Sequence, residues 1–245
     1  MNKIHIRFYE ELNDLLPKEK RKIRFEHNFR GHPSVKDVIE SQGVPHGEVD
    51  MILANGKSVG FNYILNDDDD ISVYPVFESI DIKNVQHLRE KPLRNPKFIL
   101  DVHLGTLARY LRMLGFDTLY QNNYNDEEII NISLTESRAI LTKDKGILKQ
   151  NQVNRGYFIR NINPEKQLEE VIVRFDLNNS INEFTRCLEC NTLLEQIEKE
   201  KRIHRIPSKV EKYQTEFYIC KKCNKIYWPG SHYQKMKKLI NKIVK

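Results

Sequence analysis

Residues 97–115 read KFILDVHLGTLARYLRMLG, and this stretch decides the fold of the central part of the chain. The apolar run 97–100 predicts a short buried strand that ends at Asp101. Apolar residues then recur at helical spacing, and Gly115 ends the predicted helix. They are Leu104, Leu107, Ala108, Leu111 and Leu114. A strand followed directly by a helix is the repeating unit of parallel α/β sheets.

Strands and helices continue to alternate downstream of this stretch. We expect further strands at 118–120, 139–142 and 157–159, and helices at 126–137 and 164–175. Pro164 suits the first turn of the last helix, because proline has no N–H to donate there. The alternation predicts an α/β domain over residues 96–178, built on a doubly wound parallel sheet.

Three aspartates mark one edge of the predicted sheet. Asp101 and Asp144 each follow a strand, and Asp126 starts a helix on the same edge. Ligands of open parallel sheets bind beyond the carboxyl ends of the strands. Crowded carboxylates need a compensating cation, and their oxygens favour Mg²⁺ or Mn²⁺. The alternatives are that Asp126 is only a helix N-cap, that Asp144 is only a turn residue and that Asp101, which is harder to dismiss, is only a cap.

Three basic residues near these acids are candidates for contacts with phosphate groups. Arg109 and Arg112 lie three residues apart on the helix after Asp101, off its leucine stripe, and Lys143 precedes Asp144. Arginine and lysine side chains commonly bind nucleic-acid phosphates. For the two arginines, the alternative is that they pair with Asp or Glu at the surface.

The only four cysteines of the chain form two C-x2-C pairs, Cys187 with Cys190 and Cys220 with Cys223. This spacing predicts one structural zinc ion held by four thiolates in tetrahedral geometry. Two disulfides would need an oxidising compartment, and a redox motif would need only one pair near a βαβ unit. We therefore expect residues 183–245 to form a separate zinc ribbon with a basic C-terminal helix.

The net charge of +6 is concentrated in the cysteine-bearing end of the chain. Residues 187–245 hold 14 Lys and Arg against 6 Asp and Glu, whereas residues 1–186 hold 26 against 28. Such a local excess suits a polyanion such as RNA or DNA, and the alternative is a solvated basic helix. From His232 onward, Met236, Leu239, Ile240 and Ile243 recur at helical spacing. This pattern predicts a helix that packs one face on the ribbon and exposes its lysines.

Residues 1–79 predict a small α+β domain. We expect strands at 4–8, 22–25, 51–54 and 71–76, and a helix at 35–41 that begins after the N-cap residue Ser34. Strand, strand, helix, strand, strand is the order of a β-grasp, or ubiquitin-like, fold. The acidic run 67–70 is interpreted as a solvated turn. Residues 80–95, with their flanking prolines, are expected to be the linker to the next domain.

The composition is that of a globular protein, with 39% hydrophobic and 30% charged residues. No run of about 18 apolar residues is present, so we expect no membrane span. The N-terminus, MNKIHI, lacks the apolar core of a signal peptide. These features predict a cytoplasmic protein.

Several of these stretches together resemble one known family. Residues 101–117, 126–129 and 141–148 are similar to the PIN-like RNase domain named after the C-terminus of the Mut-seven exonuclease. The two cysteine pairs and the segment YWPGSH at 227–232 resemble it as well. Residues 1–79 are similar to the ubiquitin-like domain that prokaryotic members carry in front. The resemblance covers nearly the whole chain.

The resemblance implies a PIN-type nuclease with a magnesium or manganese site. Asp101, Asp126 and Asp144 would be its metal ligands, and Asn161 or Asn163 would supply a further oxygen. Asp117 matches a Gly-x-Asp turn of the family. The implied activity is metal-dependent hydrolysis of RNA, including tRNA or other structured RNA. The alternatives are a non-catalytic RNA-binding adaptor and a sulfur carrier, and the carrier would need a free C-terminal Gly-Gly.

Overall fold

The computed structural model of the chain describes residues 1–75, 96–198 and 206–244. The fold divides into two compact units, whose segments alternate along the chain. The first unit comprises Met1–Arg94 and Asp126–Phe158, and the second comprises Asn95–Asn125 and Ile159–Lys245. The predicted linker, residues 80–95, lies outside the described residues, as do residues 76–79 at the end of the predicted first domain.

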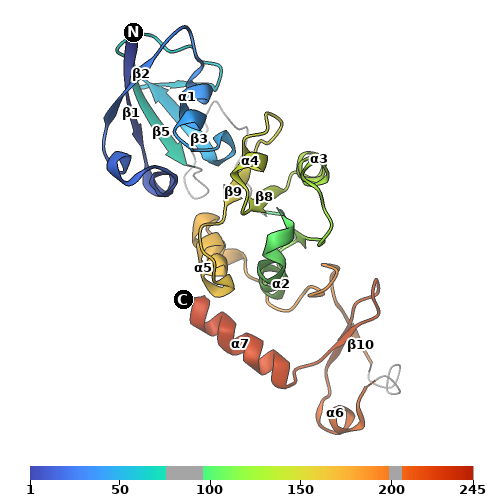
Figure 1. Cartoon of the computed structure of the whole chain (residues 1–245). Helices are drawn as coiled ribbons and strands as arrows, with labels where there is room; N and C mark the ends of the chain where they lie inside the picture. The colour runs from blue at the N-terminus through green and yellow to red at the C-terminus, as the bar shows by residue number, and fades with distance from the viewer. Residues whose placement is uncertain (76–95, 199–205, 245) are drawn as a thin grey trace. The chain divides into compact units, whose positions relative to one another are not determined.

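A five-stranded mixed sheet forms the N-terminal part of the first unit, in the order β2-β1-β5-β3-β4 (Figure 1). Its strands are β1 (Asn2–Phe8), β2 (Phe25–Phe29), β3 (Val49–Ala54), β4 (Lys57–Val59) and β5 (Asp70–Pro75). β1 pairs in parallel with β5, and the other pairs are antiparallel. α1 (Val35–Ser41) packs its buried side chains into the core of this sheet. Three short 3-10 helices, η1 (Glu10–Leu15), η2 (Lys18–Lys20) and η3 (His46–Glu48), occupy the connections. The arrangement is compatible with the predicted ubiquitin-like fold.

Helix α1 begins at the predicted N-cap. The Ser34 hydroxyl accepts a hydrogen bond from the Asp37 backbone N at 3.2 Å, and the Asp37 carboxylate accepts one from the Ser34 N at 3.1 Å. This reciprocal pair is a capping box, which satisfies N–H groups that have no partner within the helix. The predicted N-cap residue Ser34 was therefore sufficient to place the start of α1.

One strand prediction for this region is wrong, and one further strand was not predicted. The second strand begins at Phe25 rather than at Lys22, because Lys22 has a left-handed φ of 59° and its N–H donates to Asn13 Oδ1 at 2.6 Å. Strand β4 was not predicted. It follows the turn at Asn55 and Gly56, whose φ values of 51° and 77° suit a two-residue hairpin. An Asn-Gly pair is a strong hairpin signal, so the sequence contained the information for β4.

The acidic run 67–70 is more than a solvated turn, which corrects the prediction. The Asp69 side chain is 4% exposed. Its carboxylate accepts hydrogen bonds from Asn55 Nδ2 at 2.7 Å, from the Tyr63 hydroxyl at 3.0 Å and from the Asn66 N at 2.8 Å. A buried carboxylate with three donors holds the loop that precedes β5 in place.

The remainder of the first unit contains α3 (Asp126–Glu136), β8 (Ala139–Thr142), α4 (Lys145–Leu148) and β9 (Gly156–Phe158). The two strands pair in parallel, as predicted, whereas the short helix α4 was not predicted. Gly156 allows α4 to pack closely on β9, because a Cβ at this position would lie 2.2 Å from Leu148 Cδ2. η3 of the ubiquitin-like region also packs against α4 and β9.

The second unit contains the parallel strand pair β6 (Phe98–Leu100) and β7 (Thr118–Leu119). Helices η4 (Val102–Leu104) and α2 (Gly105–Met113) lie between them in sequence, and α5 (Pro164–Arg174) and η5 (Asn178–Ser180) follow later. Gly115 ends α2 as predicted, with φ of +93°. A Cβ there would lie 2.1 Å from the Asn182 carbonyl oxygen, so only glycine fits. The parallel pairing in both units supports the predicted α/β class.

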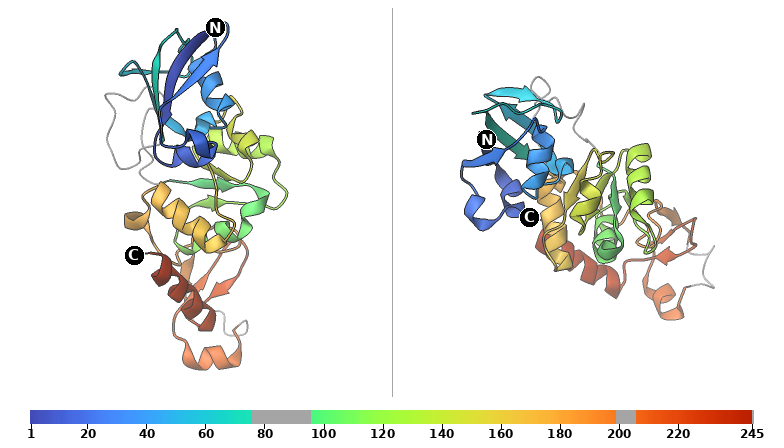
Figure 2. Two further views of the ribbon diagram at one scale, coloured as in Figure 1. Left: turned by 60° about the vertical axis from the view of Figure 1, so that its left-hand side comes forward. Right: turned by 45° about the horizontal axis from the view of Figure 1, so that its top comes forward.

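A three-stranded antiparallel sheet, here called the C-terminal ribbon, carries the cysteines. It consists of β10 (Glu195–Ile197), β11 (Phe217–Ile219) and β12 (Ile226–Tyr227), and α6 (Ser208–Tyr213) precedes β11. α7 (Ser231–Ile243) follows and lies beside α5 (Figures 1 and 2). Ile240 and Ile243 are buried, and Lys242 Nζ binds Glu165 Oε2 at 2.7 Å. The prediction that α7 packs on the ribbon is therefore incomplete, because α5 covers part of it.

The sequence predicted no membrane span, and this prediction applies to helical spans. Within the parts of the chain that the structure describes, no helix combines the length and the apolar character needed to cross a bilayer.

Candidate functional site

The four cysteines of the chain converge at one place in the second unit. Their Sγ atoms all lie within 4.8 Å of one another. Cys187 Sγ lies 3.6 Å from Cys223 Sγ, and Cys190 Sγ lies 3.3 Å from Cys220 Sγ. Zinc bonds of about 2.3 Å in a tetrahedron would separate the sulfurs by about 3.8 Å. All four thiols are free, so the cluster contains no disulfide and could hold a structural metal such as zinc.

The two cysteine pairs have the same local backbone geometry. The Asn191 N donates to the Cys187 carbonyl at 3.0 Å, and the Asn224 N donates to the Cys220 carbonyl at 2.7 Å. Both asparagines have a left-handed φ, 68° and 59°, which asparagine tolerates better than most residues. Each directly follows the second cysteine of its pair. This repeated C-x2-C-N pattern is the sequence signal for the two turns, beyond the cysteine spacing used to predict the cluster.

Burial shapes the protonation of the cluster. Burial and hydrogen bonds to the neighbouring thiols raise the pKa of Cys223 to about 12. Burial also raises the pKa of Tyr227, whose hydroxyl lies 3.1 Å from Cys187 Sγ. Because thiolates are the metal ligands, metal binding at this cluster would release these thiol protons.

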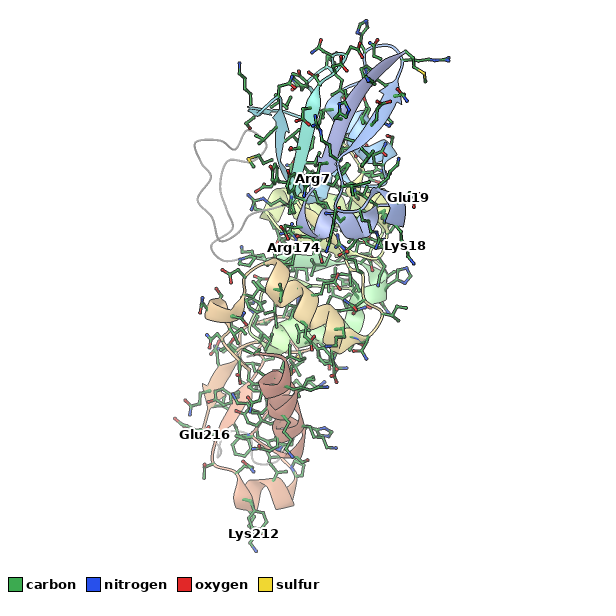
Figure 3. All side chains as sticks on the ribbon, turned by 90° about the vertical axis from the view of Figure 1, so that its left-hand side faces the viewer. Arg7, Lys18, Glu19, Arg174, Lys212 and Glu216 are labelled. Atoms are coloured by element: carbon green, nitrogen blue, oxygen red, sulfur yellow. The ribbon has the colours of Figure 1, made fainter. Side chains whose placement is uncertain are left out.

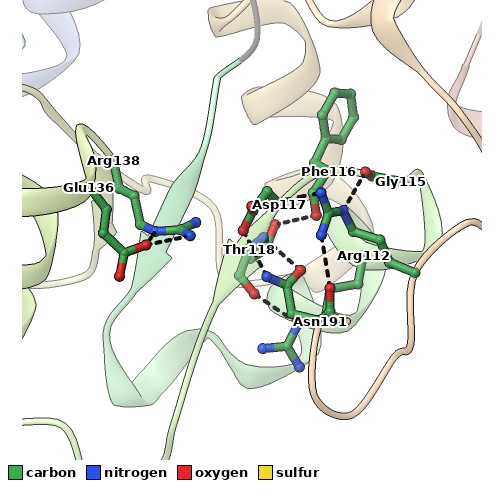
Figure 4. Close-up of polar contacts among 9 residues, drawn as sticks. Arg112, Gly115, Phe116, Asp117, Thr118, Glu136, Arg138 and Asn191 are labelled. Atoms are coloured by element: carbon green, nitrogen blue, oxygen red, sulfur yellow. Dashed lines mark hydrogen bonds and ion pairs between the residues drawn. The ribbon is translucent and has the colours of Figure 1, made fainter. Parts of the chain in front are cut away.

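Asn191 connects the first cysteine pair to strand β7 (Figure 4). Its Nδ2 donates to Asp117 Oδ1 at 2.7 Å, and its Oδ1 accepts from the Thr118 N at 2.9 Å. Arg186 adds to the same network, since its Nε donates to the Gly115 carbonyl at 3.0 Å. Asp117, which matches the Gly-x-Asp turn, therefore helps to attach the cysteine-bearing segment to the strand.

Arg112 is buried, and the prediction that it contacts phosphate at the surface is wrong. Arg112 as a whole residue is 3% exposed. Nε donates to the Thr118 carbonyl at 2.9 Å (Figure 4). Nη1 donates to the carbonyls of Leu188 at 3.1 Å and Glu189 at 2.7 Å. Burial lowers its pKa. Arg112 lies off the leucine stripe of α2, and its side chain there contacts the cysteine-bearing segment rather than solvent.

Arg109 and Lys143 have different environments. The Arg109 side chain is 58% exposed, and its Nη2 lies 3.5 Å from Glu189 Oε1. Lys225 Nζ binds the same oxygen at 2.9 Å and lowers the pKa of Glu189 through this hydrogen bond. Arg109 thus forms the surface ion pair that was considered as the alternative. Lys143 is half-buried at the end of β8.

The three candidate metal ligands each lie at the beginning of a helix. Asp101 follows β6, is 6% exposed and caps η4 by accepting from the His103 N at 2.8 Å. Asp144 follows β8, is exposed and caps α4 by accepting from the Gly146 N at 2.7 Å. Asp126 is the exposed first residue of α3 rather than the residue before it. A carboxylate has two oxygens with several acceptor positions, so capping is compatible with metal binding.

The other proposed oxygen donors have structural roles. Asn163 is the N-cap of α5, and its Oδ1 accepts from the Glu165 N at 2.9 Å and the Lys166 N at 3.3 Å. Asn161 Nδ2 donates to Glu170 Oε2 at 2.6 Å. These contacts give Asn161 and Asn163 structural roles in the segment that leads into α5.

Comparison with known families agrees with the resemblance in both its parts. The family described as Mut7-C RNAse domain matches residues 96–240. The family described as Mut7-C ubiquitin matches residues 1–81. Neither the curated proteins nor the solved structures include a match to this chain.

Proposed function

This chain belongs to the Mut7-C RNAse domain family, and on that premise we propose that it is a metal-dependent ribonuclease that hydrolyses RNA phosphodiester bonds. The family match over residues 96–240 carries the proposal. Within it, the substrate is RNA, including tRNA or another structured RNA. The reaction is in-line attack of water at phosphorus, with 5′-phosphate and 3′-hydroxyl products.

Asp101, Asp126 and Asp144 are the proposed ligands of a Mg²⁺ or Mn²⁺ ion. Their carboxylates are hard oxygen donors, and the caps of η4 and α4 hold two of them in place. A bound ion would activate water and offset the negative charge of the phosphate. Arg109 and Lys143 are the remaining candidates for phosphate contacts.

The C-terminal ribbon is proposed to be a zinc ribbon that assists RNA binding. A zinc ion bound by the four cysteines would join the two cysteine pairs, because each pair contributes two thiols. The excess of basic residues in 187–245 would then attract the RNA backbone. Free thiols fit a reducing compartment such as the cytoplasm.

Cleavage of a mixed pool of structured and single-stranded RNA, with and without Mg²⁺ or Mn²⁺, tests the proposal. Asp101→Asn and Asp144→Asn remove the charge and keep an oxygen that can cap the helix. We expect both variants to lose metal-dependent cleavage and to retain RNA binding. Glu127→Gln is the matched control, because Glu127 is an exposed acid in the same helical turn as Asp126.

Two results would contradict the proposal. One is cleavage by both asparagine variants at the wild-type rate. The other is the absence of cleavage by wild type together with tight, salt-dependent binding of RNA, which would favour the non-catalytic RNA-binding adaptor.

A further inference from the structure

A cavity of about 510 Å³ lies within the second unit, between the C-terminal ribbon, residues 182–186 and the beginning of α7. Five aromatic side chains line it: Phe184, Tyr218, Tyr227, Trp228 and Tyr233. Its volume is within the roughly 300–1,000 Å³ of small-molecule sites. We propose that this cavity, called the aromatic pocket below, binds an unpaired base of RNA by stacking. The proposal takes its ligand class from the proposed function.

The walls of the aromatic pocket are anchored to the cysteine cluster and to α7. The Tyr227 hydroxyl accepts a hydrogen bond from the Leu188 N at 3.3 Å, beside Cys187. The rings of Phe184 and Tyr233 have centroids 4.4 Å apart and are tilted by 39°. These contacts hold aromatic rings from the ribbon, the loop and the helix in fixed positions, and a preformed site reduces the entropy lost on binding.

Phe184 has a strained backbone. Its φ of 58° lies in the left-handed region, which is unfavourable for a bulky side chain. The Phe184 N donates to the Met113 carbonyl at 2.8 Å, and the Asn182 N donates to the Leu114 carbonyl at 2.9 Å, so the end of α2 holds the loop in place. Strain of this kind persists only where the surroundings impose it, and it concentrates at binding sites.

Gly230 provides space for the Trp228 ring. A Cβ at position 230 would lie 2.8 Å from Trp228 Nε1 and 3.0 Å from Cδ1. The indole therefore lies against the backbone just before α7. Trp228 and Tyr218 are half-buried, so part of each ring remains accessible from the pocket.

The charged residues that line the pocket are Glu183, Glu216 and Arg186, and Glu183 forms an ion pair with Lys237 of α7. Lys235 and Lys238 are exposed on α7, and Lys222 is exposed in the second cysteine pair. Proteins that bind single-stranded nucleic acid combine aromatic rings, on which any base can stack, with basic groups along the backbone. A duplex keeps its bases stacked on one another, so the pocket should select unpaired RNA.

Trp228 gives a direct readout, because it is the only tryptophan in the chain. The zinc-loaded full-length protein would be titrated, without added Mg²⁺ or Mn²⁺, with a short single-stranded oligoribonucleotide. A duplex with the same number of phosphates serves as the comparison. We expect the single strand to quench the Trp228 emission and the duplex to leave it nearly unchanged. Equal responses to the two RNAs, or no response to either, would overturn the proposal.

Substitutions provide an independent test by anisotropy of labelled single-stranded RNA. Trp228→Ala and Phe184→Ala should each raise Kd by about 10- to 100-fold, the usual effect of removing one stacking partner. Trp228→Phe should retain most of the affinity, since an aromatic face remains. The control is Tyr213→Ala in α6, because Tyr213 is 75% exposed and does not line the pocket. Its neighbour Lys212 extends from α6 away from the strands (Figure 3). If both pocket variants bound single-stranded RNA with wild-type affinity, the proposed role of the aromatic pocket would be refuted.

The two proposals can fail separately. The experiments on the aromatic pocket measure RNA binding and do not depend on cleavage. If Asp101→Asn abolishes cleavage while the pocket variants bind normally, only the aromatic pocket is wrong. If no cleavage is found but the pocket variants lose single-stranded RNA, only the ribonuclease assignment is wrong.

Discussion

Glu48 Oε1 accepts a hydrogen bond from the backbone N of Phe158 at 2.8 Å, although the two residues are 110 positions apart in sequence. Glu48 is fully buried in η3 of the ubiquitin-like region, and Phe158 ends β9. Lys149 Nζ adds a second bond, to the Glu40 carbonyl at 3.1 Å. The Phe158 ring also packs against the core of the N-terminal sheet. The ubiquitin-like region therefore belongs to the same compact unit as β8 and β9.

Loss of the Glu48 acceptor should destabilise the first unit. Glu48→Ala leaves the Phe158 N–H without this partner, and an unsatisfied buried donor costs about 1–3 kcal/mol of unfolding free energy. Glu48→Gln keeps an acceptor oxygen and should cost less. Urea denaturation measures both. Glu26→Ala is the control, since Glu26 forms an exposed ion pair with Lys3, and a change above about 0.5 kcal/mol there would be unexpected.

Replacement of Arg112 should affect stability and metal retention together. Arg112→Met removes the donor shared by three carbonyls, two of them in the first cysteine pair, and should cost about 2–3 kcal/mol. Looser packing of that pair should also speed zinc transfer to a chromogenic chelator. Arg109→Met, three residues away and exposed, should change neither quantity appreciably. Equal behaviour of the two variants would show that the buried guanidinium does not support the cysteine cluster.

Stability should fall as the pH is lowered below neutrality, through His46. Burial lowers the pKa of this 5%-exposed ring, and nearby Lys36 acts in the same direction, against the raising effect of its hydrogen bond to Glu40. The unfolded chain, with a His pKa of about 6.5, then binds the proton more tightly than the folded chain. The free energy of unfolding should therefore decrease from about pH 7 toward pH 5.5.

Urea titrations across this pH range compare wild type with His46→Gln. The variant should show a shallower dependence on pH. The pKa of His27 is lowered too, chiefly by partial burial, so His27→Gln tests the smaller contribution of a more exposed ring. Parallel pH profiles for wild type and His46→Gln would exclude His46 as the cause.

Removal of zinc should unfold the C-terminal ribbon before the rest of the chain. The four thiols lie at the centre of the contacts between the two cysteine turns, beside the Tyr227 hydroxyl and the Lys225–Glu189 ion pair, and binding energy at such a site is folding energy. Chelation should change the Trp228 emission while most of the far-ultraviolet circular dichroism remains. The Cys223→Ser variant should reproduce this state without a chelator. Full order of the ribbon in metal-free protein would contradict the expectation.

Local signals in the sequence determined where several elements begin or end. The Ser34 capping box, the Gly115 stop and Pro164 in the first turn of α5 each act within a few residues, so a short window contains their cause. The four cysteines were predicted to come together for the same reason, because two short spacings are typical of a shared metal site. The Asn-Gly hairpin and the C-x2-C-N turns were equally local, and the sequence analysis overlooked them.

Only the tertiary structure decided which polar side chains are buried and what they contact. Arg112 and Arg109 are alike in sequence, yet one binds three carbonyls in the interior and the other is exposed. Asp69 was interpreted as part of a solvated turn, yet it is buried and accepts from Asn55. Glu48 carries no signal in the sequence, yet it is buried and accepts from a backbone N 110 residues away. Burial of a polar group depends on partners brought near by folding, and these partners lie far away along the chain. The spacing of apolar residues identifies the apolar face of a helix, but it does not show which residues pack against its other faces.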